Sequence, residues 1–299
     1  MEINATIRKL NEIDKLINDK ELEKAEEKLN ELLENTEKTE ISTHGQIFDF
    51  ENDIQFVFYC NKVGKSRNIE WKQNFLSEMY LQKAMIYYEK QEYDEALKQL
   101  KISLKWNPVK THAYMEILEI YIKTKSWDQF EKTVKEAIEI ATTPLEISIF
   151  YKKYAYFFIE KGEYEIAYNI LRYTTLIYYR EENIDEIRYL SKIVKIDLKK
   201  TADIGTIQYI QEHGLEYKTN LAVISAHITM AKAFENRLRE EKEIMPLQER
   251  KNILNRLITI YTNLYFFDCE AEIHNLQMNA IRELQKIIQE EQNDEKQSN

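Results

Sequence analysis

Residues 77–108 read SEMYLQKAMIYYEKQEYDEALKQLKISLKWNP, and this stretch predicts two amphipathic helices joined by a short turn. Tyr80, Ala84 and Tyr87 are spaced by four and then three residues, which places them on one stripe of a helix. The small side chain of Ala84 allows a partner helix to approach closely, and Ala96 does the same from the second helix. The stretch therefore predicts a closely packed helical hairpin.

Two further copies of this pattern follow along the chain. The first copy consists of Tyr80, Ala84, Tyr87, Tyr93, Ala96, Leu100 and Leu104. The second lies 34 positions later, at Tyr114, Leu118, Tyr121, Trp127, Phe130, Val134 and Ile138. The third lies a further 37 positions on, at Tyr151, Ala155, Phe158, Tyr164, Ala167 and Leu171. A single hairpin cannot bury such faces, so the units are expected to stack. An ordinary helical bundle is the alternative, but bundles have no fixed period of this length.

The pattern resembles the tetratricopeptide repeat (TPR), a helical hairpin with a 34-residue period. The strongest local matches are KGEYEIA at 161–167 and QEYDEA at 91–96. Three features depart from the family pattern: Lys83 replaces an apolar residue, Phe130 replaces a small one, and the third copy has three extra residues. The resemblance covers residues 77–179.

The resemblance implies an all-α fold, an α-solenoid of antiparallel hairpins wound as a right-handed superhelix. In the family, the first helix of each hairpin lines a concave face that holds a peptide, helix or loop of a partner. Family members that bind acidic carboxylate tails have Lys and Asn where Leu81 and Met85 stand here. That ligand is therefore disfavoured.

The stripe beside the core stripe of each first helix defines the predicted groove. It holds Leu81, Met85, Tyr88, Met115, Glu119, Ile122, Lys152, Tyr156 and Ile159. Because exposed apolar grooves usually mark binding sites, we predict that partner binding uses Met85, Tyr88, Met115, Ile122, Tyr156 and Ile159. Two alternatives stay open at this point: the chain's own C-terminal helices fill the groove, or a tight superhelix buries it.

Composition favours helices along the whole chain. Five Gly and three Pro in 299 residues leave few turns and few helix breakers, so no sheet is expected. The aromatic-rich segment 47–62 is interpreted as one helix. The expected parts of one continuous solenoid are an N-terminal hairpin with an irregular helical unit (1–75), three TPR-like repeats (76–181), degenerate helical repeats (182–292) and a disordered tail (293–299).

The net charge of −10 and pI of about 5.3 argue against nucleic acid as a partner, because such a surface repels phosphate. The N-terminus lacks the basic and apolar segments of a signal peptide, and no apolar run approaches the length of a membrane span. We therefore expect a cytoplasmic protein that binds neither nucleic acid nor membrane.

No catalytic, metal or cofactor motif stands out, so the chain is not expected to be an enzyme. Gly64-Lys65-Ser66 lacks the earlier glycine of a phosphate-binding loop. No two of the five histidines have the helical spacing of a metal pair. Cys60 and Cys269 lie in apolar helical runs, which predicts buried free thiols.

Two functions remain as hypotheses. The first is a scaffold or adaptor that binds a protein segment in the apolar groove. The second is a peptide- or ligand-responsive regulator that acts through protein contacts, because the Lys/Glu-rich residues 1–36 lack a basic DNA-recognition helix. An enzyme with a site assembled from distant residues is the third and weakest interpretation.

Overall fold

The computed structural model describes residues 3–38, 45–64, 68–241, 244–268 and 271–297. These residues form 14 helices and two short strands, so the fold is all-α apart from one strand pair. The chain divides into two compact units, Met1–Tyr217 and Lys218–Asn299. The boundary falls after residue 217, whereas the sequence suggested a change of character after residue 181.

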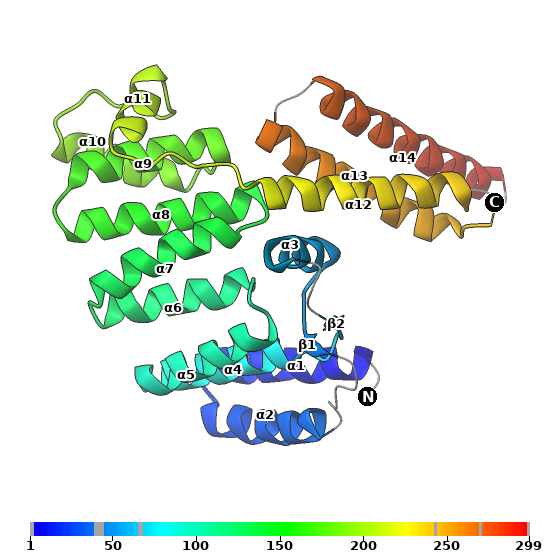
Figure 1. The fold of residues 1–299 in the computed structure, drawn as a ribbon, viewed down its shortest axis with the longest axis horizontal. Helices are drawn as coiled ribbons and strands as arrows, with labels where there is room; N and C mark the ends of the chain where they lie inside the picture. Colours follow the sequence, from blue (N-terminus) through cyan, green and yellow to red (C-terminus); the bar gives the residue numbers. More distant parts are fainter. Residues whose placement is uncertain (1–2, 39–44, 65–67, 242–243, 269–270, 298–299) are drawn as a thin grey trace. The chain divides into compact units, whose positions relative to one another are not determined.

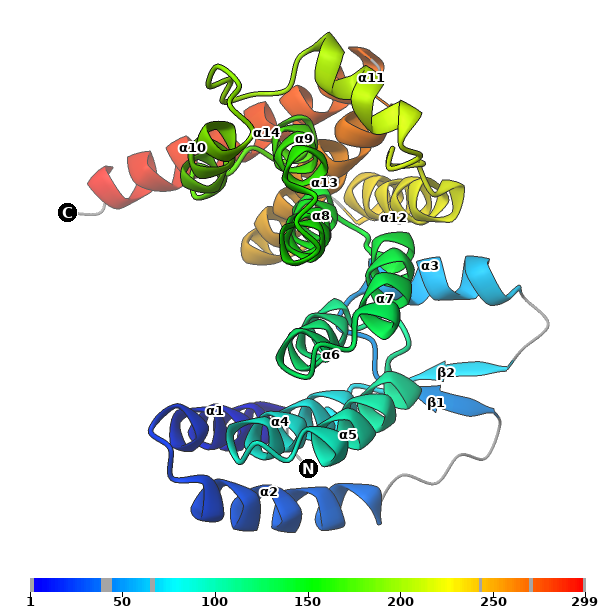
Figure 2. The same ribbon diagram turned by 90° about the vertical axis from the view of Figure 1, so that its left-hand side faces the viewer.

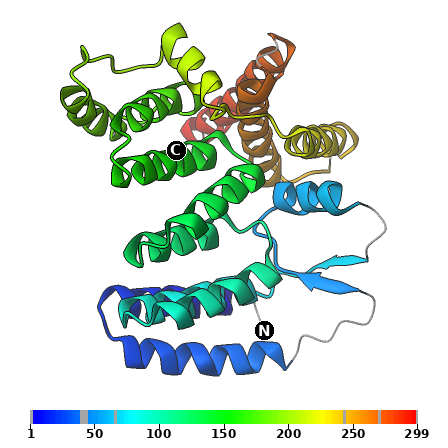
Figure 3. The same ribbon diagram turned by 60° about the vertical axis from the view of Figure 1, so that its left-hand side comes forward.

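The first unit is a succession of helical hairpins (Figure 1). Its helices are α1 (Ile3–Asn18), α2 (Leu22–Glu37), α3 (Asp53–Val63), α4 (Leu76–Glu89), α5 (Tyr93–Trp106), α6 (Thr111–Lys123), α7 (Trp127–Ile140), α8 (Pro144–Glu160), α9 (Tyr164–Ile177), α10 (Asn183–Ile193) and α11 (Ile204–Glu212). The three expected repeats correspond to the pairs α4–α5, α6–α7 and α8–α9. Within the first unit, Figure 3 shows these pairs following one another, and α5 packs on α6 as α7 packs on α8.

The turns inside the three hairpins share one backbone conformation. Gln91, Lys125 and Gly162 each have a positive φ, of 63°, 55° and 77°. A left-handed residue after a helix satisfies the last carbonyl groups and reverses the chain. These positions are 34 and 37 residues apart, as the sequence repeat requires. The three extra residues of the third copy lengthen its first helix. α8 has 17 residues and α6 has 13, while the connection before α8 (141–143) is one residue shorter than the connection before α6 (107–110).

The small residues of the repeats lie in the core as predicted. Ala84 and Ala96 belong to one buried cluster between α4, α5 and α6, and Ala167 is also fully buried on α9. Phe130, at the matching position of the second hairpin, is fully buried as well. The register of the repeats along the three hairpins therefore agrees with the structure.

Enlarging either buried alanine should overpack a helix contact. We expect Ala96→Leu and Ala167→Leu each to lower the free energy of unfolding by about 1–3 kcal/mol, because added methyl groups force shifts in a filled core. Thermal melts of both variants measure this. Lys101→Leu, an exposed position on α5, is the control and should change stability little. Unchanged melts for both alanine variants would contradict the observed packing.

The expectation of no sheet is wrong. Strands β1 (Gln46–Phe48) and β2 (Ile69–Trp71) form a parallel pair with Gln46 opposite Ile69 and Phe48 opposite Trp71. Residues 47–62, expected as one helix, contain most of β1 and the first ten residues of α3. Asn52 starts α3, because its side chain accepts a hydrogen bond from the Gln55 amide at 3.0 Å. Figure 2 shows the β1–α3–β2 insertion beside the helical hairpins of the first unit.

Aromatic packing explains why the insertion leaves helical geometry. Phe50 lies 5.4 Å from Tyr59 and 6.5 Å from Trp71 between ring centroids. The Trp71 ring nitrogen donates a hydrogen bond to the Phe50 carbonyl at 2.9 Å. Phe48 and Phe50 are both fully buried. One continuous helix would not bring these side chains and β2 into a single cluster.

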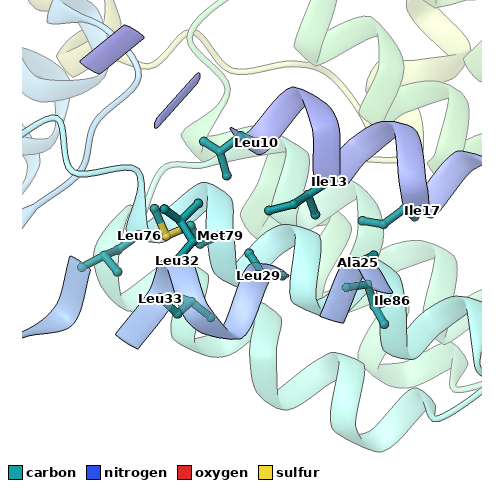
Figure 4. Close-up of a cluster of buried hydrophobic side chains, with 10 residues drawn as sticks. All are labelled: Leu10, Ile13, Ile17, Ala25, Leu29, Leu32, Leu33, Leu76, Met79 and Ile86. Atoms are coloured by element: carbon teal, nitrogen blue, oxygen red, sulfur yellow. The ribbon is translucent and has the colours of Figure 1, made fainter. Parts of the chain in front are cut away.

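The N-terminal hairpin packs on the first repeat. Figure 4 shows its apolar cluster, with Leu10, Ile13 and Ile17 on α1 facing residues of α2 and α4. The full buried set is Leu10, Ile13, Ile17, Ala25, Leu29, Leu32, Leu33, Leu76, Met79 and Ile86. The expected N-terminal hairpin is therefore present, and it covers one side of α4.

The second unit consists of α12 (Leu221–Glu240), α13 (Leu247–Asp268) and α14 (Ala271–Gln297). α13 packs on both neighbours. His227 is buried on α12, with its Nδ1 2.9 Å from the Val223 carbonyl and its ring 5.7 Å from the Phe267 ring. Burial lowers the pKa of His227, which favours the neutral ring.

The expectation of a disordered tail at 293–299 differs from the structure. Residues 293–297 continue α14, and residues 298–299 lie outside the described part of the chain. The tail has no apolar residue to anchor it, but it also has no Pro or Gly to end the helix, and Glu, Lys and Gln are good helix formers.

Candidate functional site

The first helices of the second and third repeats line a cavity of about 440 Å³, here called the groove cavity. Three of the six predicted groove residues meet there: Ile122 on α6, with Tyr156 and Ile159 on α8. Ile149 and Ala155 on α8 and Leu171 on α9 complete its apolar lining. The spacing of the repeat thus brings residues more than 30 positions apart to one surface.

Charged side chains line the rim of the groove cavity in pairs. Lys152 Nζ on α8 lies 2.8 Å from Glu186 Oε1 on α10. Lys153 forms an ion pair with Glu119 on α6, so this pair links the first helices of adjacent repeats. Partly exposed pairs of this kind contribute little stability. They surround an apolar floor with both signs of charge.

Tyr156 is the most exposed of the predicted groove residues, with 38% of its surface accessible. Partial burial raises the pKa of its phenol, and a hydrogen bond to Glu160 and the Glu119 charge add to this. Partial burial also raises the pKa of Tyr88 on α4, with Glu119 again contributing. Both tyrosines therefore lie within electrostatic reach of the same carboxylate on α6.

The remaining predicted residues do not line the groove cavity. Met85 packs against the cluster formed by α1, α2 and α4, and Leu81, expected beside it in the groove stripe, is fully buried in the core. Tyr88 packs against Tyr93, with ring centroids 5.7 Å apart. Met115 is partly exposed on α6. The N-terminal hairpin packs on α4 and covers part of the helix stripe that was predicted to line the groove.

Several residues of the groove cavity were not predicted. Lys123, Ile149, Lys153, Leu171 and Glu186 all belong to its lining. Ile149 and Lys153 each lie three residues from a predicted stripe residue on α8, so a wider stripe would have included them. Glu186 comes from α10, outside the recognisable repeats, and no sequence signal pointed to it.

A second polar centre joins the β1–α3–β2 insertion to the repeats. Lys110, which precedes α6, is 1% exposed, and its Nζ lies 2.6 Å from Glu51 Oε1 and 2.7 Å from Glu78 Oε2. Gln55 donates to Glu51 at 2.8 Å and accepts from the buried Asn107 at 3.0 Å. Burial disfavours the Lys110 charge, but Glu78 and Glu51 outweigh it and raise the pKa of the lysine. Lys110 is therefore charged at neutral pH.

The described residues bear on some of the sequence predictions about metal binding, thiols and histidines. These residues contain no group of three or more His, Cys, Asp or Glu side chains placed to hold a metal ion. Cys60 is only partly buried, and Cys269 and the Lys65-Ser66 dipeptide lie outside the described ranges. His112 is exposed, with Nε2 3.5 Å from Glu116 Oε1. Across the described part of the chain, every helix is too short or too polar to span a bilayer.

Comparison with models of known protein families gives no match, and comparison with curated proteins gives no relative.

Proposed function

We propose that this chain is a protein–protein interaction scaffold that binds a partner segment in the groove cavity. The observation that carries the proposal is the joining of Ile122, Tyr156 and Ile159 into one apolar cavity between successive first helices. A cavity of about 440 Å³ lies within the range of ligand pockets. It fits one or two large side chains of a peptide or helix.

The rim suggests the chemistry of the partner segment. Lys152 and Lys153 are paired with Glu186 and Glu119, and Lys123 adds one further positive charge to the lining. A segment with a large apolar or aromatic anchor, flanked by side chains that hydrogen-bond these pairs, fits such a surface. Most of the binding free energy should then come from the anchor. Binding should consequently depend weakly on salt.

The proposal takes the hairpins to form a TPR-like solenoid with a right-handed superhelix. The 34- and 37-residue spacing of the left-handed turn residues and the buried Ala96 and Ala167 support this assignment. It also takes the protein to act in the cytoplasm, because neither a signal peptide nor a membrane span is expected from the sequence.

A second surface could bind a partner instead of the groove cavity. It carries three exposed tyrosines, Tyr178, Tyr179 and Tyr189.

The second candidate function is a peptide-responsive regulator that uses the same cavity. The Lys152–Glu186 pair connects the third repeat to α10, so an occupant of the cavity would touch a helix outside the repeats. A change in α10 on binding would favour the regulator, whereas binding without such a change favours a plain scaffold. Hydrogen exchange of residues 183–193 with and without a captured partner separates the two.

The test is a double variant, Ile122→Ala with Tyr156→Ala. Truncating both side chains should weaken partner binding roughly 30-fold or more, since large anchors each contribute about 1–2 kcal/mol. Tyr88 is left intact because it packs on Tyr93 and does not line the groove cavity. A photocrosslinking residue at Ile159 captures the partner, and mass spectrometry identifies the crosslinked segment. Binding of that segment as a synthetic peptide is then measured by titration calorimetry.

The matched control is Tyr179→Ala with Tyr189→Ala, which removes two aromatic side chains that are 56% and 62% exposed. This variant should bind the peptide as the parent does. Both variants must melt like the parent. Loss of binding in the control, with binding kept in the groove variant, would place the site on the outer surface near α10.

A further inference from the structure

A second cavity, of about 290 Å³, lies where the β1–α3–β2 insertion meets α1 and α4. It is here called the N-terminal cavity. Its polar lining includes Asp14 from α1, Asp49 and Glu51 from the segment after β1, Glu78 and Gln82 from α4, and Lys110. None of these residues lines the groove cavity. The two cavities therefore share no lining residue.

Gln82, which lines this cavity, has an acceptor atom without a hydrogen-bond partner. Its side chain is fully buried, and its Nε2 donates to the Leu10 carbonyl at 3.1 Å and to Asp14 Oδ1 at 2.6 Å. Its Oε1 is buried and accepts no hydrogen bond from any described residue. A buried acceptor without a donor destabilises the folded state, because it has lost its hydrogen bonds to water. The described residues therefore leave Gln82 Oε1 in need of a donor.

Negative charge also exceeds positive charge around the cavity. Four carboxylates line it, and Lys110 is the cation in its lining. That lysine pairs with Glu51 and Glu78, and Asp49 accepts hydrogen bonds from the Ser77 amide and hydroxyl at 3.0 and 2.8 Å. For Asp14, the Gln82 amide is the hydrogen-bond donor that the described residues supply.

The electrostatics of Asp14 agree with this imbalance. Burial raises the pKa of its carboxyl, the Gln82 hydrogen bond opposes that rise, and the Glu78 charge adds to it. His112 is the other titratable group that acts on Asp14, and it lowers the pKa. A cation in the cavity would offset both burial and the repulsion from Glu78.

We propose that the N-terminal cavity binds one organic cationic group, a guanidinium or ammonium, between Gln82 Oε1 and the Asp14 carboxylate. Such a group supplies several N–H donors and a positive charge, which are the two things that the cavity lacks. A metal ion fits less well, because no set of metal-ligating side chains is assembled among the described residues. The volume is at the lower end for ligand pockets and suits one arginine-sized or lysine-sized group.

The cation has two possible sources, a free small amine or a basic side chain of a partner protein. Four probes separate them, each titrated into the full chain by calorimetry. n-Butylguanidinium and n-butylurea have nearly the same shape but differ in charge. A blocked pentapeptide with a central arginine and its citrulline counterpart form the same pair within a peptide.

Saturable one-to-one binding of n-butylguanidinium, with none for n-butylurea over the same range, is the expected result. The arginine peptide binding more tightly than n-butylguanidinium assigns the site to a partner's side chain. Binding of n-butylguanidinium alone assigns it to a free small organic cation. Absence of saturable binding by both cations, or equal binding of the urea, overturns the proposal.

Asp14→Asn is the decisive variant, because asparagine still accepts the hydrogen bond from Gln82 but carries no charge. It should weaken n-butylguanidinium binding about tenfold or more. Gln82→Met, which removes the unpartnered Oε1, should weaken it as well. Glu12→Gln is the matched control on the same helix, since Glu12 is exposed and pairs with Lys28 at 2.5 Å. An Asp14→Asn protein that melts like the parent and binds the cation equally well contradicts the proposed site.

Discussion

Replacing Lys110 with methionine is expected to lower the free energy of unfolding by about 3–5 kcal/mol. Methionine fills a similar volume but leaves Glu51 and Glu78 facing each other without the cation between them. Removing one partner of a buried ion pair is far more costly than the pair's net contribution. The two carboxylates are 40% and 31% exposed, so water screens them in part and the lower end of the range applies.

Urea unfolding followed by circular dichroism measures the change. Glu51→Gln with Glu78→Gln in the Lys110→Met background should recover part of the loss, because the repulsion between the carboxylates is gone. Lys98→Met is the control, since Lys98 is exposed and pairs with Glu95 at 2.8 Å. It should change the free energy of unfolding little, because exposed ion pairs contribute little stability. Equal losses for Lys98→Met and Lys110→Met would show that the buried pairs contribute no more than an exposed one.

The sequence could not reveal the role of Lys110. Its partners lie 59 and 32 positions away, and one of them belongs to an insertion whose structure was predicted wrongly. A single local hint existed: Lys110 stands directly before α6, where the positive end of the helix dipole disfavours a cation. A lysine at that position is favourable only if carboxylates from elsewhere reach it.

The insertion shows why the periodic pattern failed at 46–71. Strand β1 has three residues, too few for alternation to be distinguished from an aromatic helix face. Its partner β2 lies 23 positions later, and a parallel pair is held by hydrogen bonds between segments distant in sequence. By contrast, the hairpins are local structures. The hairpin predicted within residues 77–108 is present as α4 and α5.

The spacing of the repeat indicates that Ile122, Tyr156 and Ile159 share a surface, and all three line the groove cavity. Met85 lies outside this cavity, because α1 and α2 pack on α4, a contact between elements separated by the insertion. Whether these residues bind a partner stays a prediction. A helix stripe beside the buried stripe is exposed only if no other helix packs on it. The spacing of residues within a repeat does not show which other helices pack there.

Replacing Phe130 with alanine is expected to lower the free energy of unfolding by about 3–5 kcal/mol. The TPR pattern has a small residue at this position, so the family pattern alone would suggest that alanine fits well. In this structure, Phe130 is fully buried and stacks on Phe157 with ring centroids 5.7 Å apart and planes 6° apart. The Trp127 ring meets it edge-on at 6.1 Å. Alanine would remove these contacts and leave a cavity.

The cost depends on whether the helices can close around the smaller residue. α6 packs on α7 less closely than α4 on α5 or α8 on α9, where Ala96 and Ala167 occupy the matching positions. If α7 moved closer to α6 to fill the space left by the Phe130 ring, it would have to move away from α8 and Phe157. Urea unfolding tests this, with Tyr189→Ala, which is 62% exposed, as the control. A Phe130→Ala protein as stable as the parent would mean that α6 and α7 approach freely, and that the small-residue rule holds in all three hairpins.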